Sequence, residues 1–155
     1  MDPSDLDPGV QEAIELFESS EVGQQLRDPM ECGGRCRRAA QRFLSALRTK
    51  ERKGQLLEWA WEGGWHHAVQ LDGTDIVIDW TAAQFEDDPD AARRVPFPRI
   101  ETRAATEERW GEPAVIDMDK GHDLYFHNVP PLVPWSVAQG RIPDRGSEQE
   151  RLNRH

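Results

Sequence analysis

The apolar pattern changes from helical spacing to alternation between residues 48 and 57, and this change constrains the fold more than any other feature. From Cys36 to about Arg48, apolar residues recur at helical spacing opposite a polar face, which predicts an amphipathic helix. From Leu57 to Trp80, aromatic and β-branched residues alternate between glycine turns, which predicts three antiparallel strands. We therefore expect an α+β fold in which the helix packs on an antiparallel sheet.

Other elements are predicted on both sides of this region from caps, breakers and spacing. Asp7-Pro8 combines an N-cap with proline at the first helical position, and Gly111 is a helix stop. The predicted elements are helices over 8–18, about 20–26 and 101–110, a helical turn through Phe85, an acidic loop over 86–90, and a strand over 114–116.

The chain has 155 residues, enough for one domain with a core of its own. We expect a single catalytic domain over residues 1–120, with its core motifs in 30–85. Residues 121–155 are rich in proline and charge, so we expect a draped or disordered C-terminal extension there.

The charge balance narrows the range of partners. A net charge of −10 and a pI near 4.9 repel phosphate backbones and anionic lipid surfaces. We expect no nucleic acid or membrane partner, and instead a protein or peptide substrate. No segment has the pattern of a signal peptide or transmembrane helix, so we expect a cytoplasmic location, or delivery as part of a larger secreted protein.

Cys36 lies where the central helix is predicted to begin. The unpaired N–H groups and the positive end of the helix dipole stabilise a thiolate at this position. Arg35, Arg37 and Arg38 gather in the same turn, where cations oppose the dipole unless an anion lies nearby. Cys36 is therefore the candidate nucleophile.

A cysteine nucleophile needs an imidazole beside it and a third group that orients the ring. His67 shares a strand face with Val69 and Leu71, which should look toward the helix, and Asp79 ends the next strand. A three-residue bulged loop at 71–73 would align His67 with Asp79, whereas a two-residue turn would align His66 with Asp79. We favour His67 as the base and Asp79 as its orienting carboxylate.

Three stretches then resemble the Cys, His and Asp motifs of small papain-like domains found in bacterial polymorphic toxins and phage proteins. They are Gly34-Arg35-Cys36-Arg37-Arg38-Ala39-Ala40-Gln41-Arg42-Phe43-Leu44, His67-Ala68-Val69-Gln70-Leu71 and Ile78-Asp79-Trp80-Thr81-Ala82-Ala83-Gln84-Phe85. The resemblance covers roughly residues 30–110, and the segment from Asp79 to Phe85 is its most specific part.

This resemblance implies a papain-like, transglutaminase-like fold and a Cys36, His67, Asp79 triad. The implied activities are peptide hydrolysis, glutamine deamidation and transglutamination through a thioester, in an effector or toxin-type domain that a cognate inhibitor or immunity protein would restrain. Papain has an oxyanion-hole glutamine shortly before its cysteine, whereas Gln24 and Gln25 lie far upstream here. The Cys36 backbone N–H is the candidate donor instead.

Two other interpretations compete with this one. Cys32, Cys36, His66 and His67 are residue types that bind zinc, but adjacent strand residues point to opposite faces, so we expect no metal and no cofactor. The acidic balance also suits a non-catalytic domain that masks the basic surface of another protein, as inhibitors and immunity proteins do. In that case Cys36 would be an inert buried thiol.

Overall fold

The computed structural model describes residues 1–116 as an α+β fold built on one antiparallel sheet. The strands lie in the order β4-β3-β2-β1-β5. They are β1 Gly54–Trp61, β2 Gly64–Leu71, β3 Ile76–Asp79, β4 Arg99–Thr102 and β5 Ala114–Ile116. The helices are α1 Pro8–Ser19, α2 Glu21–Leu26, α3 Cys36–Thr49, α4 Pro89–Arg93 and α5 Arg103–Trp110, with 3-10 turns η1 Pro3–Asp5, η2 Pro29–Glu31 and η3 Ala82–Phe85.

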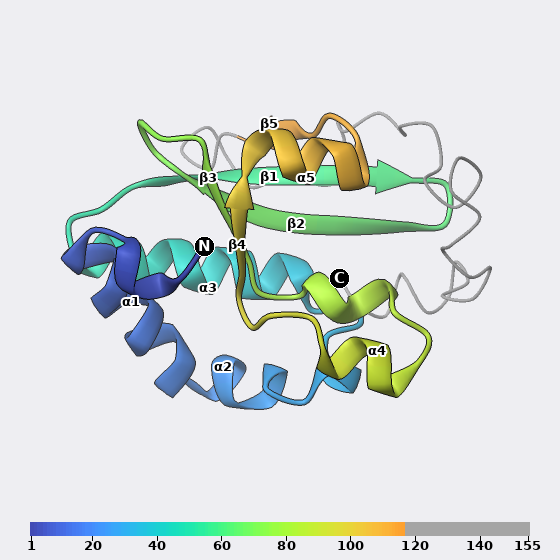
Figure 1. Cartoon of the computed structure of the whole chain (residues 1–155). Helices are drawn as coiled ribbons and strands as arrows, with labels where there is room; N and C mark the ends of the chain where they lie inside the picture. Colours follow the sequence, from blue (N-terminus) through green and yellow to red (C-terminus); the bar gives the residue numbers. More distant parts are fainter. Residues whose placement is uncertain (117–155) are drawn as a thin grey trace.

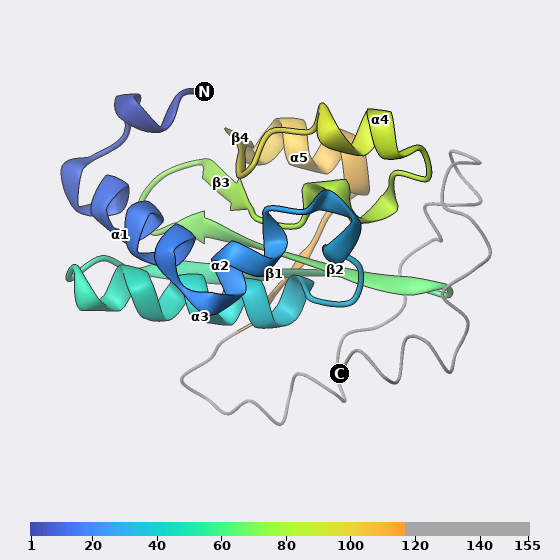
Figure 2. The ribbon, with the colours of Figure 1, turned by 90° about the horizontal axis from the view of Figure 1, so that it is seen from below.

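Helix α3 is the central helix of the fold. Its buried stripe includes Ala39, Ala40, Phe43 and Leu47, and it packs against α1 on one side and against β1 and β2 on the other. Figure 1 shows α1 and α3 on one side of the sheet and α5 on the opposite side. In the view from below, α1, α2 and α3 lie in front of the strands (Figure 2).

The sheet is covered on both faces by apolar side chains. Toward α1 and α3, the ring of Trp80 lies 4.1 Å from that of Phe17 and 5.4 Å from that of Phe43. Toward α5, Trp61 lies 5.9 Å from Trp110 between ring centroids. Residues 56–61 of β1 are therefore all buried, because both faces of this strand contribute to a core.

Most of the predicted elements are present. The helices predicted over 8–18, 20–26 and 36–48 are α1, α2 and α3, and the strand predicted over 114–116 is β5. Four elements were not predicted: the 3-10 turns η1 and η2, the edge strand β4, whose last two residues fall in the helix predicted over 101–110, and α4, which begins inside the expected acidic loop. All four are short, so their patterns carry little periodicity.

The connection between β2 and β3 differs from the prediction. The strands are joined by residues 72–75, not by a three-residue bulged loop, and Val69 pairs with Ile78. Gly73 does take the predicted left-handed conformation, with φ of 75°. The even number of loop residues decides which histidine shares a face with Asp79.

The predicted domain limit at residue 120 and the extension over 121–155 lie outside the described residues. Within residues 1–116, none of the helices has the length and apolar character needed to cross a lipid bilayer.

Candidate active site

Cys36 is the first residue of α3, and the preceding turn holds it there. The Arg35 N–H donates to the Cys32 carbonyl over 3.2 Å, and Gly34 has a φ of 79° that few other residues adopt. Arg35 occupies the N-cap position, but its side chain makes no capping hydrogen bond. The positive end of α3 is therefore directed at the thiol without a side-chain cap in between.

The thiol of Cys36 lies in hydrogen-bond contact with one histidine. Its Sγ is 3.0 Å from Nδ1 of His67 and 3.8 Å from the carbonyl oxygen of Trp65. The predicted meeting of Cys36 with His67, rather than with His66, is thus present. It arises because His67 lies on the face of β2 that α3 covers, as its place beside Val69 predicts.

The carboxylate behind His67 is Glu58, which the sequence interpretation did not include. Glu58 pairs with His67 across β1 and β2, and its Oε2 lies 3.1 Å from His67 Nε2. A signal for it exists in the sequence, because Glu58 is the single charged residue within the apolar run 56–61. A fully buried glutamate is rare unless it is paired.

Asp79 does not contact His67, which corrects the predicted triad geometry. Its Oδ2 lies 2.7 Å from Nε2 of His66, and its Oδ1 accepts a hydrogen bond of 3.1 Å from the Thr81 N–H. The register explains the difference: with Val69 opposite Ile78, the next positions along put Asp79 on the face that carries His66.

His66 forms a second, separate polar cluster on the α5 side of the sheet. The Gln84 amide group contacts its Nδ1, while its Nε2 contacts Asp79, so both ring nitrogens are engaged. The rings of Trp59, Phe85 and Trp110 surround it at centroid distances of 5.6, 5.5 and 4.9 Å. Because both ring nitrogens have partners and aromatic rings enclose the imidazole, His66 fits a structural role better than a role in proton transfer.

Burial sets the electrostatics of the Glu58 carboxyl. Desolvation raises the pKa of Glu58 to about 8, and the positive charge of Arg37 partly opposes that rise. Desolvation likewise lowers the pKa of Arg37, which the charges of Glu58 and Cys36 partly restore. Among the described residues, Glu58 Oε1 has no hydrogen-bond partner. The site therefore combines the Cys36 thiol, the Glu58 carboxyl group and the His67 imidazole with one guanidinium group, that of Arg37.

The two cysteines differ in their capacity to react. Burial raises the pKa of the Cys32 thiol to about 12, and its Sγ is 3.9 Å from the Leu26 carbonyl oxygen. Such a thiol stays protonated and unreactive near neutral pH. The thiol of Cys36 contacts the imidazole of His67, whereas the contact of the Cys32 thiol is a backbone carbonyl. Cys36 is therefore the candidate nucleophile of the pair.

Two further properties bear on the chemistry. His66 and His67 point to opposite faces of β2, and within residues 1–116 no group of three histidine, cysteine or acidic side chains is arranged to hold a metal ion. Cys36 and His67 are only 2% and 1% exposed. Any molecule that reacts with the thiol must therefore displace neighbouring side chains to reach it.

Comparison with protein-family models, with curated proteins and with solved structures gave no match to this chain.

Proposed function

We propose that the chain is a thiol-dependent acyl-transfer enzyme of the papain-like type, which acts on peptide or glutamine side-chain amides. Cys36 is the nucleophile, His67 the base and Glu58 the carboxylate that orients the base. The observation that carries this proposal is the line of contacts from Cys36 Sγ to His67 Nδ1, 3.0 Å, and from His67 Nε2 to Glu58 Oε2, 3.1 Å. A nucleophile helix packed on an antiparallel sheet that bears the base supports the papain-like assignment.

The contacts of His67 allow it to accept a proton from the Cys36 thiol and later to return it to the leaving group. With Nε2–H donating to ionised Glu58, His67 Nδ1 is bare and takes the proton of the Cys36 thiol. The thiolate attacks the amide carbon, a C–S bond forms, and the C–N bond breaks as the imidazolium returns its proton to the leaving nitrogen. Water or an amine then attacks the thioester and releases the thiol, giving hydrolysis, deamidation or transfer.

The start of α3 also suits the negative charge that develops on the carbonyl oxygen. The first turn of a helix has backbone N–H groups that no carbonyl oxygen within the helix can accept, and the side chain of Arg35, at the N-cap of α3, makes no capping hydrogen bond. The Cys36 N–H is the nearest of them to the reacting sulfur by its place in the chain. We assign it as one oxyanion donor.

The experiment uses β-casein, an unfolded protein rich in glutamine, as the acyl donor and monodansylcadaverine as the amine. Mass spectrometry separates the three outcomes: cleaved peptides, glutamine converted to glutamate, and a dansylcadaverine adduct. We expect one of them with wild type and with Cys32→Ala, and none with Cys36→Ala. Because both cysteines are buried, Cys32→Ala is the matched control for the loss of a buried thiol.

A second measurement tests the nucleophile without any substrate protein. Iodoacetamide alkylation of each cysteine is followed by peptide mass spectrometry at about pH 8 and above, where Glu58, with its pKa of about 8, is ionised. Cys36 should react faster than Cys32, and His67→Asn should remove most of the difference. Equal slow alkylation of both thiols, together with unchanged casein, would refute the enzyme and favour the acidic protein-binding alternative.

A further inference from the structure

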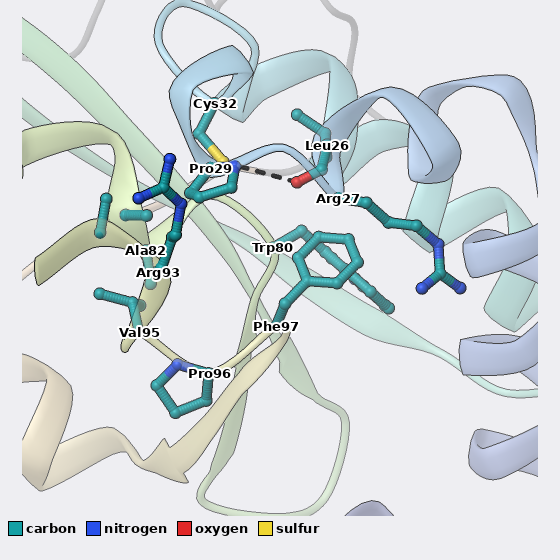
Figure 3. Close-up of a pocket in the computed structure, with 12 residues that line it drawn as sticks. Leu26, Arg27, Pro29, Cys32, Trp80, Ala82, Arg93, Val95, Pro96 and Phe97 are labelled. Carbon is teal, nitrogen blue, oxygen red and sulfur yellow. Dashed lines mark hydrogen bonds between the residues drawn. The ribbon is translucent and has the colours of Figure 1, made fainter. Parts of the chain in front are cut away.

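A pocket of about 300 Å³ lies between the turn that precedes α3 and the segment that follows β3. Its buried wall includes Cys32, Trp80 and Ala82, and its exposed rim includes Arg27 and Arg93. Figure 3 shows the two arginines on opposite sides of the group, with the rings of Trp80 and Phe97 between them. The pocket is thus apolar inside and basic at its edge.

The pocket is joined to the candidate active site through two segments. Cys32, in its wall, begins the turn that delivers Cys36, since the Cys32 carbonyl accepts the Arg35 N–H. Trp80, also in its wall, packs on Phe43 of α3, on the side of the sheet that carries His67. These two segments connect the wall of the pocket with the helix and the strand face that carry Cys36 and His67.

The size of the pocket restricts what it can hold. Sites for drug-sized ligands or cofactors occupy roughly 300–1,000 Å³, so this pocket is at the lower limit and suits one large side chain better than a whole cofactor. Its lining of Trp80, Phe97, Ala83 and Val95 favours an apolar or aromatic side chain.

The rim adds a preference for negative charge. The side chains of Arg27 and Arg93 are 55% and 64% exposed, and their present partners are the half-buried carboxylate of Glu18 at 3.9 Å and the exposed carboxylate of Asp90 at 3.1 Å. Exposed ion pairs of this kind are weak, so a carboxylate on a bound chain can replace either partner.

We propose that this pocket recognises an apolar or aromatic residue of the substrate that lies next to an acidic residue. The proposal rests on the proposed function for its connection to catalysis, since it names the class of peptide presented to Cys36. Binding itself does not require the thiol, so it can be measured separately.

The experiment uses full-length Cys36→Ala protein and three capped dipeptides: acetyl-Phe-Glu-amide, acetyl-Phe-Lys-amide and acetyl-Ala-Glu-amide. Binding is followed by ¹⁵N-resolved NMR, with the indole N–H of Trp80 as the reporter in the pocket wall. We expect saturable shifts at Trp80 and a Kd for the Phe-Glu dipeptide several-fold lower than for the other two. Arg27→Glu/Arg93→Glu should reverse the order of the Glu and Lys dipeptides.

Arg42→Glu is the matched control, because Arg42 is an exposed arginine on α3 that does not line the pocket. It should leave the order unchanged. Equal Kd values for the three dipeptides, shifts confined to residues elsewhere, or no saturation at Trp80 would overturn the pocket assignment. These results leave the casein and alkylation outcomes untouched, so failure of the pocket and failure of the enzyme are distinguishable.

Discussion

Two adjacent histidines on one strand have different surroundings, although they belong to the same residue type. His67 contacts a thiol and a carboxyl group between the sheet and α3, whereas His66 contacts Asp79 and Gln84 beneath aromatic rings on the other face. Alternation along a strand separates them completely. Only His67 lies where it can take a proton from Cys36.

Replacing each carboxylate by its amide tests which one serves His67. Because Glu58 fixes the imidazole tautomer, Glu58→Gln should lower kcat in the casein assay by about 10²-fold or more. Asp79→Asn should have a much smaller effect, since Asp79 contacts His66. Both variants are assayed at a temperature where circular dichroism shows them folded. A larger loss in Asp79→Asn would restore the triad predicted from sequence.

Arg37 should determine the pH at which the site becomes active. In the proposed mechanism His67 acts as a base only when Glu58 is ionised, and the positive charge of Arg37 opposes the rise in the pKa of Glu58 that burial causes. Arg37→Met should therefore raise that pKa further and move the acidic limb of the pH–kcat/KM profile to higher pH, while Arg37→Lys retains part of the effect.

The control for this change is Arg38→Met, in the same helical turn but exposed. It should leave the acidic limb in place. An unshifted limb in Arg37→Met would show that Glu58 ionises without help from Arg37.

At the scale of elements, α3 joins the active site to the core. Its first residue is the proposed nucleophile, while Phe43 and Leu47 farther along are fully buried between α1 and the sheet. The apolar stripe thus sets the position of Cys36, because it fixes both the rotation of the helix and its depth on the sheet.

Removing part of this stripe should destabilise the fold. Leu47 is fully buried, so Leu47→Ala leaves a cavity in the core. We therefore expect a loss of about 2–5 kcal/mol in the free energy of unfolding. The neighbouring exposed Arg48→Ala should change it by less than about 0.5 kcal/mol. Urea unfolding followed by tryptophan fluorescence measures both, and equal losses would contradict the packing described for α3.

The connection between β2 and β3 shows where element-level prediction fails. Asp72-Gly73 correctly predicts a turn, and Gly73 has the expected positive φ. The number of loop residues does not follow from Asp72-Gly73, because bulged and unbulged turns contain the same turn-forming residues. A change of one residue in that loop transfers Asp79 from one face of the sheet to the other.

At the scale of the whole molecule, burial of Glu58 makes stability depend on pH. The native pKa of about 8 lies above the ordinary value of 4.5, so between these values the folded chain holds a proton that the unfolded chain releases. The stability that this bound proton adds to the folded state is fully present below about pH 4.5 and is lost as the pH rises to about 8. Its slope is at most about 1.4 kcal/mol per pH unit.

The matched variant for this prediction is Glu58→Gln, which has no proton to release. Between pH 5 and 8, the free energy of unfolding of wild type should fall relative to that of Glu58→Gln, as measured by urea unfolding at several pH values. Parallel curves for the two proteins would show that Glu58 has an ordinary pKa in the folded state.

The sequence alone determined the α+β class and the approximate limits of α1 and α3, because these depend on local periodicity, and the alternation along the strand favoured His67 over His66 as the partner of Cys36. Only the tertiary structure decided the carboxyl partner. Glu58 and Asp79 both lie on strands that neighbour β2, and their faces follow from pairing registers that no local pattern encodes. Strand pairing depends on contacts between distant residues, and it therefore decided that Glu58 contacts His67 and that Asp79 contacts His66.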